Sequence, residues 1–353
     1  MTSPLVRIGF VGVGNMGQAA HLRNFHMVSG CEVVAIADVR STHATAVAHK
    51  WGVPHVYTSH QDMLAAHPNI DALVAIQPFT RHGTLITELL SYGKPILTEK
   101  PIAGSIAQGE AIIAAMHKHN TWMMVGYHKR SDPATISAKK EIDRLKKTGE
   151  LGKLTYIRIL MPAGDWIANG FNQNIWSSDG EHPLPEDPPA SDMDAPTNAA
   201  YIEFVNYYIH QVNLMRHLLG EDWHITYATK SGHLLVGEST SGITCSIEMS
   251  PYQTTIDWQE SALICFEHGW VKLELPAPLA FNRPGRVEMM RDPGNGIEPT
   301  TLSPHLPWIH AHWNQSEHFV AAVAGSRVPV CTAQEALADL TLAREYIRLY
   351  LGK

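Results

Sequence analysis

The stretch VRIGFVGVGNMG, residues 6–17, decides the fold that we predict for this chain. An apolar run, Val6–Val11, leads directly into the pattern Gly12-x-Gly14-x-x-Gly17, and a helical pattern follows. A strand, a glycine turn and a helix in this order open a dinucleotide-binding βαβ unit. In such a unit Gly12 permits a tight turn, Gly14 lets the backbone approach a pyrophosphate, and Gly17 lets the helix pack closely on the sheet. The alternative is an ordinary glycine-rich turn between a strand and a helix.

An acid ends the second apolar run, Glu32–Asp38. Asp38 would accept hydrogen bonds from the adenosine ribose and repel the 2′-phosphate of NADP, so the sequence favours NAD over NADP. Arg40, two residues later, weakens this preference. Amide groups at the helix start would hold the pyrophosphate, and Asn15 and Met16 in the turn are expected to line the same site.

Apolar runs continue to alternate with helical stretches up to about residue 126. Runs without strict alternation suit strands that are buried on both faces of a parallel sheet. The further strands are expected at Ala72–Gln77, Pro95–Thr98 and Trp122–Gly126, with helices at Thr84–Tyr92 and Ile106–His119. We therefore predict an α/β fold whose N-terminal domain, residues 1–128, is a Rossmann-type, doubly wound parallel sheet.

The pattern changes in residues 129–353, which we assign to a second domain. A helix is expected at Pro133–Lys147, a strand at Thr155–Leu160, and a single long helix at Val205–Leu219. Alternating strands separated by short gaps then predict an open-faced, mostly antiparallel sheet, at Ile225–Thr229, Ile243–Met249, Ala262–Glu267, Val271–Leu275 and Arg286–Met290. Closing helices are expected at Ser316–Ala324 and Ala333–Leu351. The irregular, proline-rich stretch Pro162–Asn198 is long enough to indicate a functional loop or a disordered segment.

Composition excludes several classes of protein. The net charge is −7 and no basic stripe occurs, so a nucleic-acid partner is not expected. No apolar run is long enough to span a membrane, and the N-terminus lacks the pattern of a signal peptide. Four widely spaced cysteines among 353 residues favour reduced thiols. We expect a cytoplasmic protein with no membrane partner.

A second motif, Glu99-Lys100-Pro101, follows the expected strand Pro95–Thr98. Together with the glycine turn upstream and a histidine-bearing helix downstream, it resembles the signature of the glucose–fructose oxidoreductase, inositol dehydrogenase and MocA family (Gfo/Idh/MocA). The resemblance covers essentially the whole chain. It implies an NAD(P)-dependent oxidoreductase that acts on sugars or polyols. It also implies that residues 129–353 form an α/β domain for substrate binding and oligomerisation, and that the protein assembles as a homodimer or homotetramer through the C-terminal sheet.

The resemblance also implies roles for residues around Lys100. In the family the lysine of this motif reaches the substrate hydroxyl beside the nicotinamide, so Lys100 is a candidate catalytic and cofactor-binding residue, with Glu99 positioning it at the cofactor site. Pro78 and His82 match cofactor-site positions after the third expected strand of this series. The location agrees with the general rule that open α/β sheets bind ligands at the carboxyl ends of their strands.

The helix motif departs from the family pattern. Family members carry Asp-x-x-x-His, whereas this chain has Asn206-Tyr-Tyr-Ile-His210, with Asn213 three residues further on. The spacing predicts one polar helix face opposite an apolar one. His210 matches the catalytic histidine and is the candidate general base, while Asn206 can orient substrate but carries no charge. A buried interface histidine is the alternative for His210.

Further substrate contacts are expected from Tyr127 and His128, after the last parallel strand, and from the loop aromatics Trp166 and Trp176, which could stack on a sugar. Packing within the irregular segment is the alternative for the tryptophans. We expect no metal site, because the histidines at 305, 310, 312 and 318 have no carboxylate partner at useful spacing.

These residues predict hydride transfer between a nicotinamide cofactor and a secondary hydroxyl of a sugar, polyol or glycoside. Two alternatives remain open. One is an enzyme that retains NAD and uses transient oxidation for glycoside cleavage or epimerisation. The other is a ligand-binding relative that has lost turnover.

Overall fold

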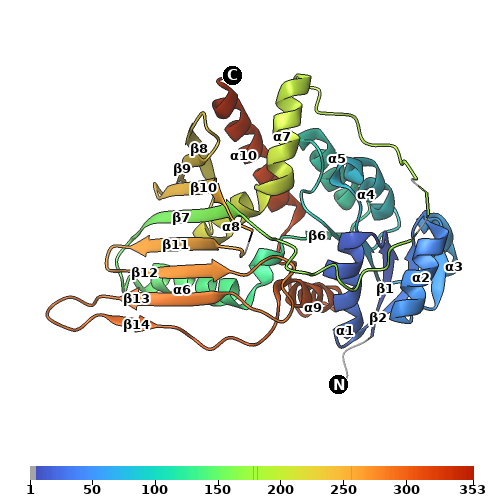
Figure 1. Ribbon diagram of the computed structural model, residues 1–353, viewed down its shortest axis with the longest axis horizontal. Coiled ribbons are helices and arrows are strands. Elements are labelled where there is room, and N and C mark those ends of the chain that lie inside the picture. The colour runs from blue at the N-terminus through green and yellow to red at the C-terminus, as the bar shows by residue number, and fades with distance from the viewer. Residues whose placement is uncertain (1–4, 178, 181, 256) are drawn as a thin grey trace. The chain divides into compact units, whose positions relative to one another are not determined.

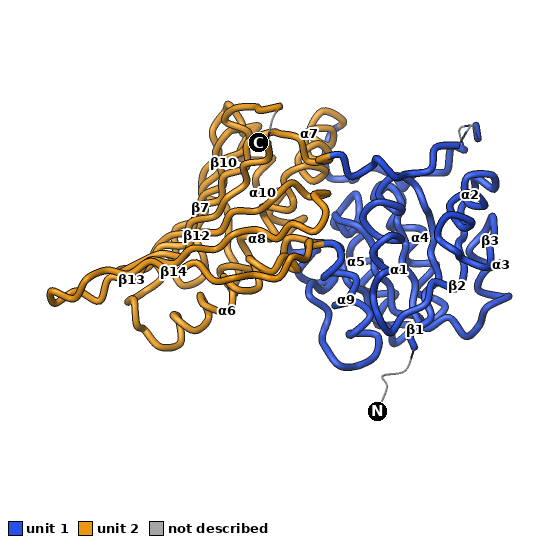
Figure 2. Tube along the Cα trace, turned by 60° about the horizontal axis from the view of Figure 1, so that its bottom comes forward, with its two compact units in different colours: residues 1–127, 169–194, 312–338 blue, residues 128–168, 195–311, 339–353 orange. Residues whose placement is uncertain are grey.

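The computed structural model describes residues 5–177, 179–180, 182–255 and 257–353. Two compact units make up the chain (Figures 1 and 2). Unit 1 comprises residues 1–127, 169–194 and 312–338, and unit 2 comprises 128–168, 195–311 and 339–353. The chain first passes from unit 1 to unit 2 after residue 127, next to the end of the N-terminal domain that we predicted at residue 128. Two later segments, residues 169–194 and 312–338, also belong to unit 1.

Unit 1 contains a six-stranded, all-parallel sheet in the order β3-β2-β1-β4-β5-β6. Its strands are β1 (Val6–Val11), β2 (Cys31–Ala37), β3 (His55–Tyr57), β4 (Ala72–Ala75), β5 (Ile96–Thr98) and β6 (Met123–Val125). The helical elements are η1 (Gly17–Leu22), α1 (Arg23–Met27), α2 (Ser41–Trp51), α3 (His60–Ala66), η2 (Phe79–Arg81), α4 (His82–Leu90), α5 (Ile106–Lys118) and α9 (Ala311–Val323). The Rossmann prediction is confirmed.

The short strand β3 and helix α3 were missed by sequence reasoning. The strand has only three residues, and none of them is fully buried, so its hydrophobic signal is weak. Other boundaries follow local signals. The side chains of Ser59 and Ser105 accept hydrogen bonds from Asp62 N and Gln108 N and so cap the starts of α3 and α5.

Unit 2 contains an eight-stranded sheet in the order β14-β13-β12-β11-β7-β10-β9-β8. All neighbours are antiparallel except β7 and β10. The strands are β7 (Leu154–Ala163), β8 (Trp223–Ala228), β9 (Leu234–Ser239), β10 (Thr244–Gln253), β11 (Glu260–Phe266), β12 (Gly269–Leu275), β13 (Arg286–Arg291) and β14 (Thr300–Leu302). The mostly antiparallel sheet is confirmed, with β9 and β14 added to the predicted strands.

One face of this sheet is covered by helices α6 (Pro133–Thr148) and α8 (Ile209–Leu219), which contact its strands from β13 to β10. Side chains on the covered face are buried, and those between them are partly exposed, as the strict alternation in β11 and β12 requires. Unit 2 also contains η3 (His128–Ser131), and helix α10 (Ala333–Leu351) runs from unit 1 into it.

The predicted helix Val205–Leu219 is two helices in the structure. Helix α7 spans Ala195–Tyr207, and α8 begins after Tyr208. The apolar stripe predicted for this region is buried, at Val205, Ile209, Val212, Met215 and Leu219. The interruption lies between Asn206 and His210, so these two residues stand on different helices.

None of the helices described is both long and apolar enough to cross a membrane. The four cysteines, all of them described, form no disulfide.

Candidate functional site

The glycine turn after β1 has the geometry that the sequence predicts. Gly12 has φ +91°, and a Cβ there would lie 2.3 Å from the Ile76 carbonyl oxygen. A Cβ on Gly17 would lie 2.7 Å from the Gly12 oxygen, so close packing requires both glycines. Gly14 is different, because the nearest atom to its hypothetical Cβ is Arg40 Nη2, at 3.7 Å. Neighbouring protein atoms therefore do not require glycine at this position, whereas a ligand approaching the backbone would.

Asp38 lies directly after β2 and next to the glycine turn. Its Oδ1 accepts hydrogen bonds from Arg40 N and Nε, both 3.0 Å, and its Oδ2 accepts from Val13 N (3.0 Å) and Arg40 Nη2 (2.9 Å). Burial acts to raise the pKa of Asp38, but the hydrogen bonds from Arg40 and the backbone amides outweigh it and lower this pKa. The carboxylate is thus ionised at neutral pH and is engaged by Arg40.

This pairing bears on cofactor choice. A ribose that binds Asp38 has to share the carboxylate with Arg40. A 2′-phosphate could draw Arg40 away from Asp38, because guanidinium binds phosphate with paired hydrogen bonds. The arrangement therefore leaves both NAD and NADP open.

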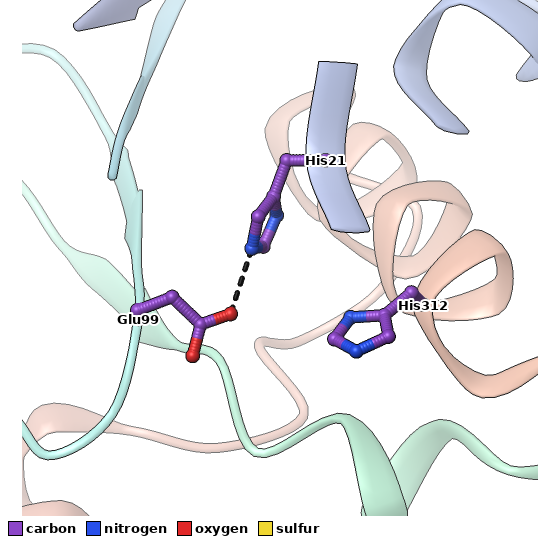
Figure 3. A group of neighbouring side chains, drawn as sticks. All are labelled: His21, Glu99 and His312. Carbon is purple, nitrogen blue, oxygen red and sulfur yellow. Dashed lines mark hydrogen bonds and ion pairs between the residues drawn. The ribbon is translucent and has the colours of Figure 1, made fainter. Parts of the chain in front are cut away.

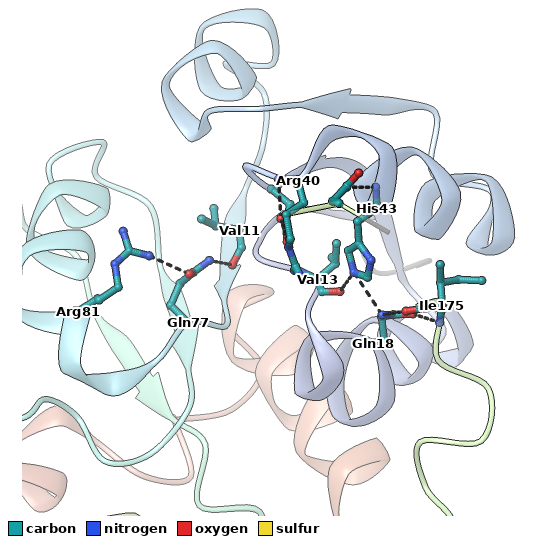
Figure 4. A network of polar contacts seen from close by, with 10 residues as sticks. Val11, Val13, Gln18, Arg40, His43, Gln77, Arg81 and Ile175 are labelled. Carbon is teal, nitrogen blue, oxygen red and sulfur yellow. Dashed lines mark hydrogen bonds and ion pairs between the residues drawn. The ribbon is translucent and has the colours of Figure 1, made fainter. Parts of the chain in front are cut away.

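The segment 169–194, which we call the strap, belongs to unit 1 and contacts the first βα turn (Figure 4). The side chain of Gln18 accepts from Ile175 N (2.8 Å) and donates to Ile175 O (3.2 Å). Asn174 Nδ2 donates to the carbonyl oxygen of Asn15 (3.1 Å). On the far side of the turn, Asp179 accepts from His43 N at the start of α2 (2.7 Å). The exposed side chain of Asn15 and the partly buried one of Met16 lie in this turn.

A second set of hydrogen bonds holds the strap at η2 and at the start of α4. The carboxylate of Asp187 accepts hydrogen bonds from Gly83 N (2.7 Å), Thr84 N (3.0 Å) and Thr84 Oγ1 (2.6 Å), and so caps α4. Nearby, Arg81 Nε donates to the Pro185 oxygen (3.0 Å). The predicted functional loop is therefore attached on both sides of the glycine turn. Sequence reasoning gave no indication of these partners, which are about 100 residues away in the chain.

His82 lies beneath the turn after β4. Its side chain is fully buried, with Nδ1 3.1 Å from Ile102 O and Nε2 3.3 Å from Gln77 O. Burial lowers the pKa of His82, so the neutral form is favoured. The histidine can therefore position the Gln77–Pro78 turn but is not on its surface, unlike the exposed Pro78.

Glu99 and Lys100 directly follow β5, at the carboxyl edge of the parallel sheet. Glu99 Oε1 lies 2.7 Å from His21 Nε2, and its Oε2 accepts from Lys100 N (3.2 Å). Figure 3 shows His312, from the first turn of α9, beside this pair. Burial acts to raise the pKa of Glu99, but the hydrogen bond and charge of His21, with His312 and Lys100, lower it to about 2. Sequence reasoning missed His21, which lies one turn of the π-helix η1 after Gly17.

In unit 2 the structure brings together two of the predicted site residues. The rings of His128 and His210 meet edge to face, with centroids 4.8 Å apart. His128 is buried, as is Tyr127 at the end of unit 1, and His210 is partly exposed. Asn206 is exposed on α7.

Asn213 lies on α8 with His210, but its side chain is part of a buried network. It is buried, accepts a hydrogen bond from Arg130 Nε (2.7 Å) and donates to Asp339 Oδ2 (2.6 Å). Arg216 Nε also donates to Asp339, at 2.7 Å. This network joins η3, α8 and α10 and has a structural role.

A second buried network stands next to His128 and was also missed. Lys129 forms an ion pair with Glu260, which further accepts from Gln211 Nε2 (2.7 Å) and Trp258 Nε1 (3.1 Å). Because buried charges are costly unless they are paired, this set of partners fixes η3 and α8 against β11.

The two loop tryptophans belong to different units. Trp176, on the strap in unit 1, is 67% exposed, whereas Trp166 in unit 2 is partly buried and its oxygen accepts from Leu279 N (3.2 Å).

Comparison with known proteins agrees with this architecture. Residues 6–127 match the profile of the oxidoreductase family with an NAD-binding Rossmann fold, GFO_IDH_MocA. The inositol 2-dehydrogenase of Rhizobium meliloti (strain 1021) is 25% identical over 97% of this chain and 96% of its own length. Inositol 2-dehydrogenase 1 of Saccharopolyspora erythraea is 35% identical over 39% of this chain and 41% of its own length. The solved structure of scyllo-inositol dehydrogenase from Lactobacillus casei is 17% identical, covers 100% of this chain and 98% of its own, and has a TM-score of 0.69.

Proposed function

Because this chain belongs to the Gfo/Idh/MocA family of oxidoreductases, we propose that it transfers hydride between a nicotinamide cofactor and a secondary hydroxyl of a sugar or polyol. The observation that carries the proposal is the pairing of an intact dinucleotide turn with Lys100 at the end of β5. The names of the relatives point to inositols and related polyols as the substrate class.

The turn fits a dinucleotide, since Gly14 leaves the backbone open and Asp38 is ionised. We assign cofactor binding to Gly12, Gly14, Asn15, Met16, Gly17, Asp38, Pro78, Glu99 and Lys100. His82 supports the site from beneath Pro78. The bound nicotinamide would supply the hydride acceptor or donor.

The residues of this chain supply the proton chemistry. We assign to His210 the removal of the hydroxyl proton during oxidation, and to Lys100 the donation of a hydrogen bond to the developing alkoxide. Glu99 positions Lys100, because its carboxylate accepts the Lys100 amide and is held by His21. Asn206, Tyr127, His128, Trp166 and Trp176 are proposed substrate contacts. Tyr127 and His128 are both buried.

We propose NAD as the preferred cofactor. The Asp38 carboxylate is ionised at neutral pH and lies at the end of β2, where a ribose hydroxyl can donate to it. A 2′-phosphate placed there would meet a second anion.

We also propose that the open face of the unit 2 sheet forms a homodimer or homotetramer contact. This face carries partly exposed aromatic, aliphatic and charged side chains, including Tyr156, Arg158, Leu263 and Trp270. Light scattering should give a mass of two or four chains, and Trp270→Glu should shift it towards one.

The proposal is tested by incubating the purified protein with NAD and a panel of inositols, aldoses and glycosides. We expect NADH absorbance to accumulate with at least one of them. Absence of both NADH and any chemical product, with NAD binding intact, would contradict the proposal.

The strap favours a second candidate function, in which NAD is retained and reoxidised within each turnover. Asp179 accepts a hydrogen bond from His43 N, and Asp187 accepts one from Gly83 N, so the strap is held on both sides of the glycine turn and could slow cofactor release. Product without accumulated NADH, and NAD that survives desalting, would favour this candidate. Asp187→Ala should then release the cofactor. Asp165→Ala should not, because Asp165 precedes the strap and, among the described contacts, accepts from Ile167 N and Ala168 N in its own loop.

A further inference from the structure

Three side chains that are far apart in the sequence meet inside unit 1. His21 comes from η1, Glu99 follows β5, and His312 stands in the first turn of α9 (Figure 3). Each offers one ligand atom, and the three atoms all lie within 4.8 Å of one another. His21 and His312 are 0% and 2% exposed, and the Glu99 side chain is 12% exposed. The group is therefore almost entirely shielded from solvent.

The composition of the group matches the ligands that transition metals prefer. Two imidazoles and one carboxylate bind Zn²⁺ with bond lengths of about 2.0–2.2 Å, which puts neighbouring ligand atoms roughly 3.3 Å apart. His21 Nε2 and Glu99 Oε1 are 2.7 Å apart and would separate slightly. The remaining atom would have to move inward by roughly 1.5 Å at most, within reach of side-chain rotation of His312.

We propose that His21, Glu99 and His312 form a binding site for a divalent transition-metal ion of the zinc class. Three protein ligands leave one coordination position open for water or another oxygen donor. The ion would replace the direct His21–Glu99 hydrogen bond and would tie η1, the end of β5 and α9 together. Because Lys100 directly follows Glu99 in the sequence, the ion would also fix the backbone segment that carries Lys100.

The competing arrangement is a hydrogen-bonded histidine–carboxylate pair with a second histidine beside it. A direct measurement of metal binding distinguishes the metal site from this hydrogen-bonded arrangement, and it does not depend on an assay of hydride transfer. Protein without a histidine tag is freed of metal with a chelator and then titrated with Co²⁺. We expect one equivalent to bind with visible absorption bands of a tetrahedral or five-coordinate ion, and Zn²⁺ to abolish these bands.

Variants test whether the Co²⁺ absorption bands come from ions bound at this site. His312→Asn and Glu99→Gln should weaken Co²⁺ binding by at least about ten-fold. The control is His318→Asn, which removes a buried histidine from the same helix but outside the group. Circular dichroism and urea unfolding establish that each variant is folded. Wild-type protein that binds no Co²⁺, or binding that His312→Asn and Glu99→Gln both leave unchanged, would overturn the proposal.

Discussion

The ring of His128 packs edge to face against that of His210, with a centroid separation of 4.8 Å and an interplanar angle of 73°. His128 is held in η3 next to Lys129, whose ion pair with Glu260 anchors the element. The proposed base therefore packs against a neighbouring aromatic ring. Four residues before it, where family members carry a carboxylate, this chain has Asn206, which lies on α7.

Asn206→Asp should therefore change the pH dependence of oxidation. A general base must be neutral, and a nearby carboxylate favours protonated imidazole, so the acidic limb of the kcat/KM profile should move to higher pH. We expect a shift of up to about one unit, since solvent screens the exposed position 206. Asn206→Ala, which adds no charge, is the control. Equal shifts in both variants would argue against an electrostatic effect on His210.

Lys100→Ala should abolish turnover while leaving NAD affinity within a few-fold of wild type. The glycine turn and Asp38, which hold the dinucleotide in our proposal, are untouched by the change. Titration of NAD followed by intrinsic fluorescence gives the affinity, and product analysis gives the rate. Turnover near the wild-type rate would show that Lys100 does not act on the substrate.

Cofactor preference should respond in opposite directions to changes at Asp38 and Arg40. Asp38→Ala removes the repulsion of a 2′-phosphate and leaves Arg40 available to bind it, so kcat/KM should shift towards NADP. Arg40→Ala removes the only charged side chain that donates to Asp38 among the described contacts, so the preference for NAD should increase. Preferences that are unchanged in both variants would place the ribose elsewhere.

Asp132 should make the stability of the protein depend on pH between about 4 and 6. Its carboxylate caps α6 through Ala134 N and accepts from Gly285 N, and burial raises its pKa from 3.8 to about 6. Because the folded pKa exceeds the unfolded one, the folded state binds the proton more tightly. Stability is therefore greatest below pH 4 for this group and falls as pH rises to 6, by at most about 3 kcal/mol.

Asp132→Asn keeps the cap and removes the titration. Urea unfolding at several pH values should show that the variant gains stability relative to wild type as pH increases from 4 to 7. A constant difference across this range would mean that Asp132 does not titrate in the folded protein in that window.

Local sequence determined the elements that place the cofactor turn. The residues that make the turn and its strand are adjacent in the chain, and a Cβ on Gly12 or Gly17 would clash with neighbouring backbone atoms. A short sequence pattern was therefore sufficient to predict them. The strands β11 and β12 could also be predicted locally. Every second residue of each strand faces the covered side of the sheet and is buried, so the sequence, most clearly in β12, alternates between apolar and more polar residues.

Only the tertiary structure shows which segments that are distant in the chain pack together. Nothing in the stretch around Asp187 indicates that its carboxylate caps α4, and nothing around His312 indicates that Glu99 and His21 lie beside it. The spacing of Asn206, His210 and Asn213 predicted one continuous helix, but the structure has a break at Tyr208. Asn213 is buried, where it contacts Arg130 and Asp339. The physical reason is that periodicity specifies which side chains are buried, whereas their partners depend on which elements pack together, and residues distant in the chain carry no local signal of that packing.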